Sequence, residues 1–270
     1  MAEIPLQLPF EGKARAGAVY VGKTEPGVRL RLGRRRLRVG EEGHFLFAFG
    51  PYAKGVYRLK MRAKDRAQET EMTVAKRQYG EEAIDGLPED EVDLDKGTKK
   101  ELRQWRRKIS KARRISRLKP DWASLNAGFR LPLKGRVTGV YGTRRTLNGK
   151  KNQRHWGIDL AARVGKKVRA PAPGVVVFAA KDIPLSGSLV IVDHGHGLSS
   201  SFLHLSRIQV REGQTLRTGQ ILGRVGSTGR ATGAHLDWRM NWRGLRVDPV
   251  SLLNPKALSY LKRHGLAEEP

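Results

Sequence analysis

The chain has 270 residues and carries 53 Lys and Arg against 26 Asp and Glu, a formal net charge of +27. This length fits one large domain or two ordinary ones, and the lack of cysteine excludes disulfides and thiolate metal sites. The charge predicts attraction to polyanions, which include nucleic acid, anionic lipid and carboxylate-rich polymers such as a bacterial cell wall.

The sequence contains no recognisable membrane or export segment. No run approaches the roughly 18 apolar residues that a membrane helix needs. The N-terminal stretch MAEIPLQLPFEG has no basic flank followed by an apolar run, so we expect no signal peptide within it.

Residues 1–80 are expected to form a small antiparallel β domain. Short alternating or apolar runs such as GVRLRLG and FLFAFG are separated by turn sequences such as EPG and EEG. We find no catalytic chemistry here, and we interpret His44 as a structural histidine.

Residues 81–129 change from acidic to basic. Residues 81–95 read EEAIDGLPEDEVDLD, whereas residues 98–117 are rich in Lys and Arg. Thr98 and Glu101 form a capping box. Four apolar residues follow at helical spacing: Leu102, Trp105, Ile109 and Ala112. We therefore predict one basic amphipathic helix that packs its apolar stripe on a domain and is partly covered by the acidic segment. A nucleic-acid-binding role for its Lys and Arg is the competing interpretation.

Residues 130–253 are expected to form an all-β domain, followed by a C-terminal tail at 254–270. Short apolar or alternating runs, such as SLVIVDHG and HLDWRMNW, lie between Gly, Pro and Ser turns, and no helical period persists. The predicted fold class is thus mainly β: a small antiparallel domain, one basic helix and an all-β domain.

Five polar residues of the second domain carry the chemistry: His155, Asp159, His204, His235 and Asp237. The spacing of four between His155 and Asp159, and of two between His235 and Asp237, keeps each pair on one face of an extended segment. Together they offer enough nitrogen and oxygen donors for a zinc site with groups left over for catalysis.

The motifs HWGIDLAA, APAPGVVVFA, SFLHLSRIQVREGQTLRTGQILGRVGSTGRATGAHLD and VDPVSLL resemble the lysostaphin/LytM-type peptidoglycan endopeptidases over about residues 130–253. Residues 16–120, including IDGLPEDEV, more loosely resemble the β domain and helix that precede the peptidase domain in some exported proteobacterial members. The resemblance implies a zinc ion held by His155, Asp159 and the last residue of a His-x-His motif. It also implies that His204 and His235 flank the metal-bound water and the substrate carbonyl.

The chain departs from the family pattern at Asp237, where the family usually has His, and at Arg239, where it usually has Glu. We interpret the two departures as one change. A zinc-bound histidine commonly donates its free ring N–H to a carboxylate, whereas an Asp ligand needs a donor for its outer oxygen, which Arg239 on the same face would supply. The expected metal ligands are His155, Asp159 and Asp237, and the expected catalytic residues are His204 and His235.

The resemblance implies a zinc-dependent endopeptidase that hydrolyses peptide bonds in peptidoglycan within the cell envelope, expected in the periplasm. We expect peptidoglycan as partner, no nucleic acid, and a monomer. The rival interpretation is a degenerate, metal-free domain that binds peptidoglycan or activates another cell-wall hydrolase, with Asp237 and Arg239 as a plain salt bridge.

Two further classes are disfavoured. The run VREGQTLRTGQILGRVG resembles the hairpins of biotinyl and lipoyl carrier domains, but the corresponding turns offer Arg217 and no Lys. Nucleic-acid binding lacks an aromatic stacking run. The remaining histidines, His194 and His196 in a predicted hairpin turn and His264 in the tail, are interpreted as structural or solvated.

Overall fold

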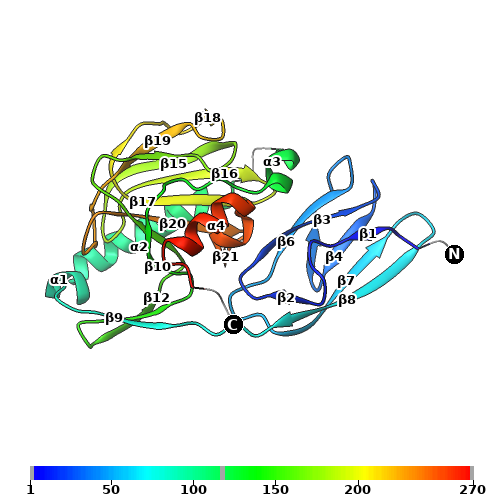
Figure 1. The fold of residues 1–270 in the computed structure, drawn as a ribbon, viewed down its shortest axis with the longest axis horizontal. Coiled ribbons are helices and arrows are strands. Elements are labelled where there is room, and N and C mark those ends of the chain that lie inside the picture. Colours follow the sequence, from blue (N-terminus) through cyan, green and yellow to red (C-terminus); the bar gives the residue numbers. More distant parts are fainter. Residues whose placement is uncertain (1–2, 116–118, 268–270) are drawn as a thin grey trace. The chain divides into compact units, whose positions relative to one another are not determined.

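The computed structural model describes residues 3–115 and 119–267, and the chain divides into two compact units (Figure 1). The first comprises Met1–Gln78 together with the short strand β21 (Leu245–Val247), and the second comprises Tyr79–Gly244 and Asp248–Pro270. The predicted mainly β fold class is confirmed. Ser116 and Arg117, at the end of the predicted basic segment, lie outside the described residues.

The first unit contains two sheets. One has the order β1-β3-β6, formed by Leu6–Gln7, Val19–Thr24 and His44–Ala48. The other has the order β2-β8-β7-β4-β5, formed by Lys13–Arg15, Ala67–Ala75, Gly55–Arg62, Arg29–Leu32 and Arg35–Leu37. The pairs β3–β6, β4–β5, β4–β7 and β7–β8 are antiparallel as expected, whereas β2 runs parallel to β8.

Alternation of apolar and polar residues determines which face of each strand is buried. In β4, Leu30 and Leu32 are buried while Arg29 and Arg31 are exposed. Because side chains alternate across a strand, this pattern places one face of the sheet against the core and the other in solvent.

The second unit is built on a large sheet. Its main path has the order β10-β13-β20-β17-β16-β15-β18, formed by Arg136–Gly139, Gly157–Ala161, His235–Trp242, Leu198–Ile208, Gly187–Gly195, Gly174–Ile183 and Thr215–Leu216. Two further strands join it through the pairing of β19 with β17: β14 at Lys167–Arg169 and β19 at Ile221–Val225. Strands β15, β16 and β17 lie side by side (Figure 1), and every residue of β16 is buried, as expected for a strand covered on both faces.

Helix α2 (Lys96–Ala112) covers part of this sheet. Ile109 and Ala112 belong to a buried cluster with residues of β15, β16 and β17, and the Trp105 ring lies 6.2 Å from that of Phe178. The prediction that the apolar stripe packs on a domain is therefore confirmed. The predicted capping box is wrong: the helix begins earlier, and its N-cap is Asp95, whose carboxylate accepts a hydrogen bond from the Thr98 backbone N–H.

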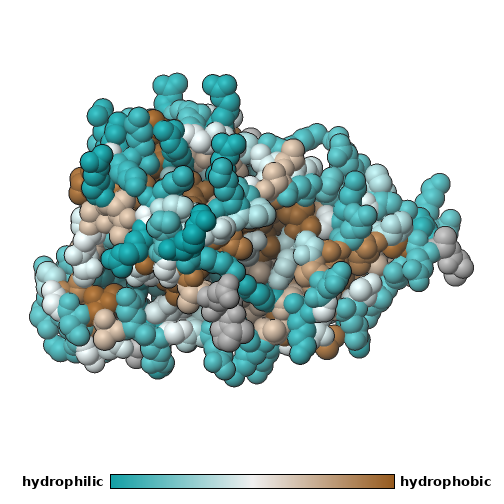
Figure 2. Space-filling view, viewed as in Figure 1, coloured by the Kyte–Doolittle hydropathy of each residue, from teal (hydrophilic) through white to brown (hydrophobic). Residues whose placement is uncertain are grey.

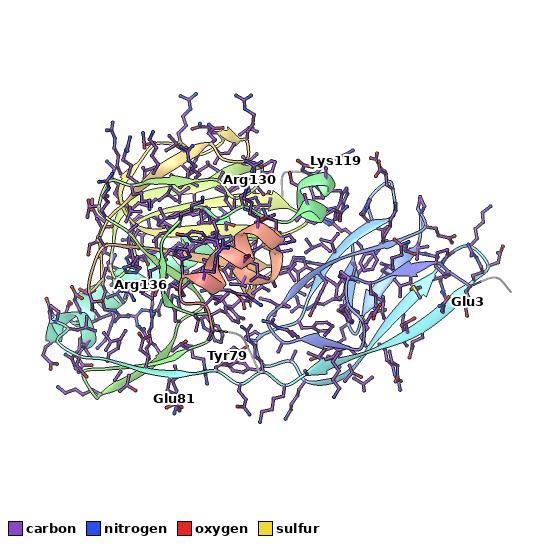
Figure 3. All side chains as sticks on the ribbon, viewed as in Figure 1. Glu3, Tyr79, Glu81, Lys119, Arg130 and Arg136 are labelled. Atoms are coloured by element: carbon purple, nitrogen blue, oxygen red, sulfur yellow. The ribbon has the colours of Figure 1, made fainter. Side chains whose placement is uncertain are left out.

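The acidic segment before this helix contributes β9 (Glu81–Ile84) and α1 (Glu89–Val92) to the second unit. Strand β9 runs parallel to β11 (Arg144–Leu147), which forms a hairpin with β12 (Lys151–Arg154). In Figure 3, Glu81 lies on this extended strand. Two acids of the segment pair with cations of the hairpin, Glu81 with Arg144 and Glu89 with Lys150.

Three short elements complete the second unit: α3 (Trp122–Ala127), a 3-10 helix at Pro249–Leu252 and α4 (Pro255–Arg263). Helix α4 lies within the expected tail. It forms because Asn254 caps its N-terminus by accepting from the Ala257 N–H, and it buries Ala257 and Leu261. None of the helices in the described ranges is long and apolar enough to cross a membrane.

The face of the molecule seen in Figure 2 is covered mostly by hydrophilic residues, as the excess of Lys and Arg implies.

Candidate metal centre

Two neighbouring strands bring the predicted carboxylates together. Strands β13 and β20 are antiparallel, and their register places Asp159 directly opposite Asp237. Because directly opposite residues share a face, the two carboxylates point to the same side of the sheet. Both are buried, with exposed fractions of 4% and 1%.

His155 precedes β13 and lies against these carboxylates. Its Nε2 is 3.2 Å from Asp159 Oδ1, and its Nδ1 is 4.0 Å from Asp237 Oδ2. Within the described part of the chain, both ring nitrogens of His155 and Oδ1 of Asp159 are buried without a hydrogen-bond partner. Unsatisfied buried polar atoms are costly, so three of them at one point fit a group that would bind all three.

His204 and His235 flank the same point. Their rings are 4.8 Å apart, with His204 Nε2 at 4.0 Å from Asp237 Oδ2 and His235 Nε2 at 3.9 Å from Asp159 Oδ1. In each ring Nδ1 lies 2.8 Å from a backbone carbonyl, that of Thr228 for His204 and that of Gly233 for His235. A carbonyl can only accept, so Nδ1 carries the proton in both rings and Nε2 of each ring faces the centre.

The backbone at His204 is unusual, with φ at 62° in the left-handed region. Few residues other than glycine adopt this conformation, and such strain is concentrated at functional sites. A shift in the β17–β19 register beside it, between Leu205 and Arg207, marks the same irregularity. The strain and the carbonyl of Thr228 together set the direction of the imidazole.

Burial and charge shift the pKa values of the centre in opposite directions. Burial lowers the pKa of His155 to about 4 despite the two carboxylates beside it, and it also lowers the pKa of His204. Burial would raise the pKa of Asp237, but the Arg239 guanidinium and His155 outweigh it and hold the pKa well below the usual range. His155 and His204 are therefore neutral and Asp237 is ionised at neutral pH.

Arg239 binds Asp237 as a neighbour on the same face of β20. Its Nε donates to both carboxylate oxygens at 3.0 and 2.9 Å, and its Nη2 also donates to Oδ2. The Asp237 and Arg239 side chains pack against Gly157 of β13, which lies opposite Arg239 in the strand register. A Cβ at Gly157 would lie 2.6 Å from Asp237 Oδ1 and 2.7 Å from Arg239 Cγ, so no larger residue fits there.

Sequence reasoning missed a second Asp–Arg pair. Arg145 of β11 donates from Nη2 to Asp159 Oδ2 at 2.7 Å and from Nε to Glu82 Oε2 of β9 at 2.9 Å. Gly139 of β10 is opposite Asp159, and a Cβ there would clash with both the carboxylate and the guanidinium. Glu82 and Arg145 are distant in sequence from the histidine motifs, and no local pattern links them.

The donor set fits a zinc ion. His155, Asp159 and Asp237 can each offer one ligand atom, and these atoms lie within 4.8 Å of one another. Imidazole nitrogen and carboxylate oxygen are accepted zinc ligands, and three protein ligands are typical of a catalytic zinc site. Asp237 retains lone pairs for a metal because a carboxylate has about four acceptor sites and Arg239 does not use them all.

The other histidines lie away from this centre. His194 belongs to the end of β16 rather than to the predicted turn, and it is buried with Nδ1 at 2.7 Å from Pro173 O and Nε2 at 2.9 Å from Ser200 Oγ. His196 occupies the turn with φ at 49°. His264 ends helix α4, where Nδ1 lies 2.8 Å from Tyr260 O.

Comparison with known proteins agrees with this geometry. The model of peptidase family M23 matches residues 153–249, which include all five of these histidines and carboxylates. The peptidoglycan DD-endopeptidase ShyA of Vibrio cholerae is 38% identical over 109 residues, 40% of this chain and 25% of that protein. The DD-carboxypeptidase/endopeptidase Mpg of Neisseria meningitidis serogroup B is 42% identical over 101 residues, 37% of this chain and 23% of that protein. The matched part of the chain thus spans about a quarter of the length of these curated relatives.

A solved structure extends the likeness beyond the matched segment. A Pseudomonas aeruginosa protein assigned to peptidase M23 is 26% identical, covers 88% of this chain and 94% of its own, and has a TM-score of 0.63. The fold that carries the centre is thus that of an M23 peptidase.

Proposed function

We propose that this chain is a zinc-dependent endopeptidase that hydrolyses peptide bonds in bacterial peptidoglycan. The proposal starts from the peptidase family M23 domain that the chain carries at residues 153–249. The observation that carries the proposal is the set of buried, unpartnered atoms of His155 and Asp159 beside Asp237. The activities for which the Vibrio and Neisseria relatives are named support the substrate class. The proposed place of action is the cell envelope, in the periplasm.

His155, Asp159 and Asp237 would hold the metal. When bound, zinc polarises a peptide carbonyl and lowers the pKa of a coordinated water. Arg145 and Arg239 orient the two carboxylates by hydrogen bonds to their outer oxygens, and an oriented ligand binds more tightly than a mobile one.

His204 and His235 would move protons. The lowered pKa of His204 keeps its ring neutral at neutral pH, so Nε2 can accept a proton from the attacking water. The protonated ring can then return that proton to the departing amine nitrogen. The Thr228 and Gly233 carbonyls hold the two rings by accepting from Nδ1–H, which keeps each Nε2 facing the centre.

One observation favours a second candidate, a metal-free domain that binds peptidoglycan. Each carboxylate already pairs with a partly buried arginine, Asp159 with Arg145 and Asp237 with Arg239. The two Asp–Arg pairs are therefore formally neutral before any metal binds. A neutral, buried cluster can persist without a cation, whereas two unpaired buried carboxylates could not.

Zinc content and muropeptide analysis test the proposal together. The purified chain is dialysed against a metal-free buffer, its zinc is measured, and it is incubated with isolated sacculi whose products are separated by chromatography. We expect about one zinc per chain and loss of cross-linked muropeptides or stem peptides. Asp237→Ala should lose the zinc and the activity.

Two outcomes would decide for the metal-free domain. One is a folded wild-type chain that contains no zinc and releases no products but still sediments with sacculi. The other is stoichiometric zinc in Asp237→Ala, which would remove Asp237 from the ligand set.

A further inference from the structure

One face of the β2-β8-β7-β4-β5 sheet in the first unit is strongly basic. Its cations line a pocket of about 660 Å³. We define this basic face by six exposed side chains: Arg29, Arg31, Arg34, Arg36, Lys60 and Arg62. Of the described residues that line the pocket, Glu69 is the one acid.

The apolar residues of the same strands fix the orientation of this face. Leu30 and Leu32 of β4, and Leu59 and Met61 of β7, are buried with exposed fractions of 6% or less. If either strand shifted its register by one residue, these apolar side chains would be exposed to solvent. The strands therefore cannot change register to move apart the cations that alternate with the apolar residues. The basic face is therefore held in solvent by the core beneath it.

Like charges face one another across these strands. The register places Arg29 opposite Arg62, and Arg31 opposite both Lys60 on β7 and Arg36 on β5. Directly opposed like charges destabilise a sheet, and neighbouring strands are only about 4.8 Å apart.

The pairing of β7 with β8 in the same sheet is different. There the register places Arg58 opposite Glu71 and Lys60 opposite Glu69, and these pairs have N···O distances of 3.2 and 3.4 Å. The sheet thus pairs cations with acids between β7 and β8, whereas the register sets Arg29 and Arg31 of β4 opposite other cations. An anionic ligand on the basic face would remove the repulsion.

The residues that line the pocket indicate which chemical class of anion it would bind. It contains no aromatic ring among the described residues, and stacked rings are what single-stranded nucleic acids usually require. Its larger apolar members, Leu30 and Met61, are buried, so the pocket offers no exposed apolar side chain of that size to insert into a lipid surface. Guanidinium groups in rows suit planar carboxylates, which they bind through two parallel hydrogen bonds.

We infer that the basic face is a docking surface for the carboxylates of peptidoglycan stem peptides, separate from the metal centre. This rests on the proposed substrate of the second unit. Stem peptides carry several carboxylates along one polymer, which matches a surface with cations on three adjacent strands. Because both units belong to one chain, docking by the first would raise the effective concentration of the wall at the second.

Cosedimentation with isolated sacculi tests this inference. All proteins carry His204→Ala, so that the sacculi stay intact. One variant combines Arg29→Gln, Arg31→Gln and Arg62→Gln. The matched control removes three exposed cations from helix α2, through Arg103→Gln, Arg106→Gln and Arg107→Gln. We expect the sheet variant to lose about tenfold in affinity at physiological salt and the control to lose less than about twofold.

A second arm identifies the ligand group. In this arm the carboxylates of the sacculi are converted to amides. The protein that carries His204→Ala alone should bind these amidated sacculi as weakly as the sheet variant binds untreated sacculi. A thermal melt checks folding, and removal of opposed like charges should leave the melting temperature unchanged or raise it. If the triple variant fails to fold, Arg31→Gln alone replaces it. This single change removes the charge that lies opposite both Lys60 and Arg36.

Three results would overturn the inference. They are equal losses in the sheet and α2 variants, full binding to amidated sacculi, or a sheet variant that loses affinity for a single-stranded oligonucleotide but not for sacculi. The assay has no catalytic readout. It can therefore fail while zinc and muropeptide measurements support the peptidase, and the reverse also holds.

Discussion

At Asp237 two cations compete for one buried carboxylate: the Arg239 guanidinium on the same strand and the metal of the proposed centre. The arginine is needed because an unpaired buried carboxylate is costly, yet every hydrogen bond it donates reduces the charge available to a metal. The properties of the site depend on how these two interactions balance, and this balance can be measured.

Exchange of both residues tests whether they act as a couple. Asp237→His and Arg239→Glu together would restore a histidine ligand with a carboxylate partner, whereas each single change leaves a ligand with the wrong neighbour. We expect either single variant to bind zinc more weakly than the double variant. Two carboxylate ligands also make the centre less positive, so the wild-type activity optimum should lie above neutral pH and move down in the double variant.

The measurements are zinc affinity by chelator competition and a pH–rate profile for the four proteins. If the effects of the two single changes simply add, the residues are not coupled.

His204 and His235 are expected to act on protons rather than on the metal. His204→Ala and His235→Ala should each retain stoichiometric zinc and lose about 10²–10⁴-fold in turnover, the range typical of a missing general acid or base. Metal analysis and initial rates on the same preparations provide the check. Zinc loss in His235→Ala would make this residue the third ligand in place of Asp237.

At the scale of elements, strand β9 contributes to the centre although it lies outside the family match. Arg145 on β11 donates hydrogen bonds to Glu82 on β9 and to Asp159 on β13, and β9 lies before the matched residues 153–249. For Arg145, burial acts to lower the pKa, but Asp159 and Glu82 outweigh it and raise it, so the guanidinium stays charged. Side chains of two other strands, β9 and β11, thus orient the Asp159 carboxylate of β13.

Glu82→Gln should therefore weaken zinc binding without touching a ligand. Loss of an outer-shell partner typically costs about 10–100-fold in metal affinity, and we expect the lower part of that range because Asp159 keeps Arg145. Glu81→Gln is the matched control, because Glu81 lies on the same strand and pairs with Arg144, which is more exposed than Arg145. Equal zinc affinities in the two variants would assign Glu82 no role at the centre.

Helix α2 and strand β9 also show where sequence analysis succeeds and fails at this scale. The helix was predicted because its apolar spacing is a local property of consecutive residues. Its cap was predicted wrongly because Asp95, Thr98 and Glu101 all offer acceptable capping chemistry, and only the backbone at Asp95 selects one of them. The partner of β9 depends on a pairing across about sixty residues, which no local pattern encodes.

At the scale of the whole molecule, buried neutral histidines make stability depend on pH. Burial lowers the pKa of His194 to about 4, although its Nδ1–H hydrogen bond to the Pro173 carbonyl opposes the shift. The unfolded chain binds a proton near the ordinary value of about 6.5, so the folded state is disfavoured progressively as the pH falls between these values. This pKa difference corresponds to about 3 kcal/mol, lost below pH 4 and fully retained above about pH 6.5.

His194→Gln should flatten this dependence. We expect lower stability at pH 7, because the fitted ring and its two hydrogen bonds are lost, but a smaller decline between pH 6.5 and pH 4. Urea midpoints across that range measure both effects, and His264→Gln at an exposed position serves as the control. A parallel decline in wild type and His194→Gln would exclude His194 as a cause of acid sensitivity.

The sequence alone determined the β-rich character of the chain and the basic helix, and its motifs singled out His155, Asp159, His204, His235 and Asp237 as candidate site residues. These features depend on periodicity and motif spacing, which are properties of neighbouring residues. The tertiary structure decided the rest. It placed Asp159 opposite Asp237, seated both Asp–Arg pairs over glycines, brought Glu82 to Arg145, and set like charges against one another on the basic face. Each of these depends on strand register and long-range pairing, because the energy that selects a register comes from burying whole strands together and not from any single residue.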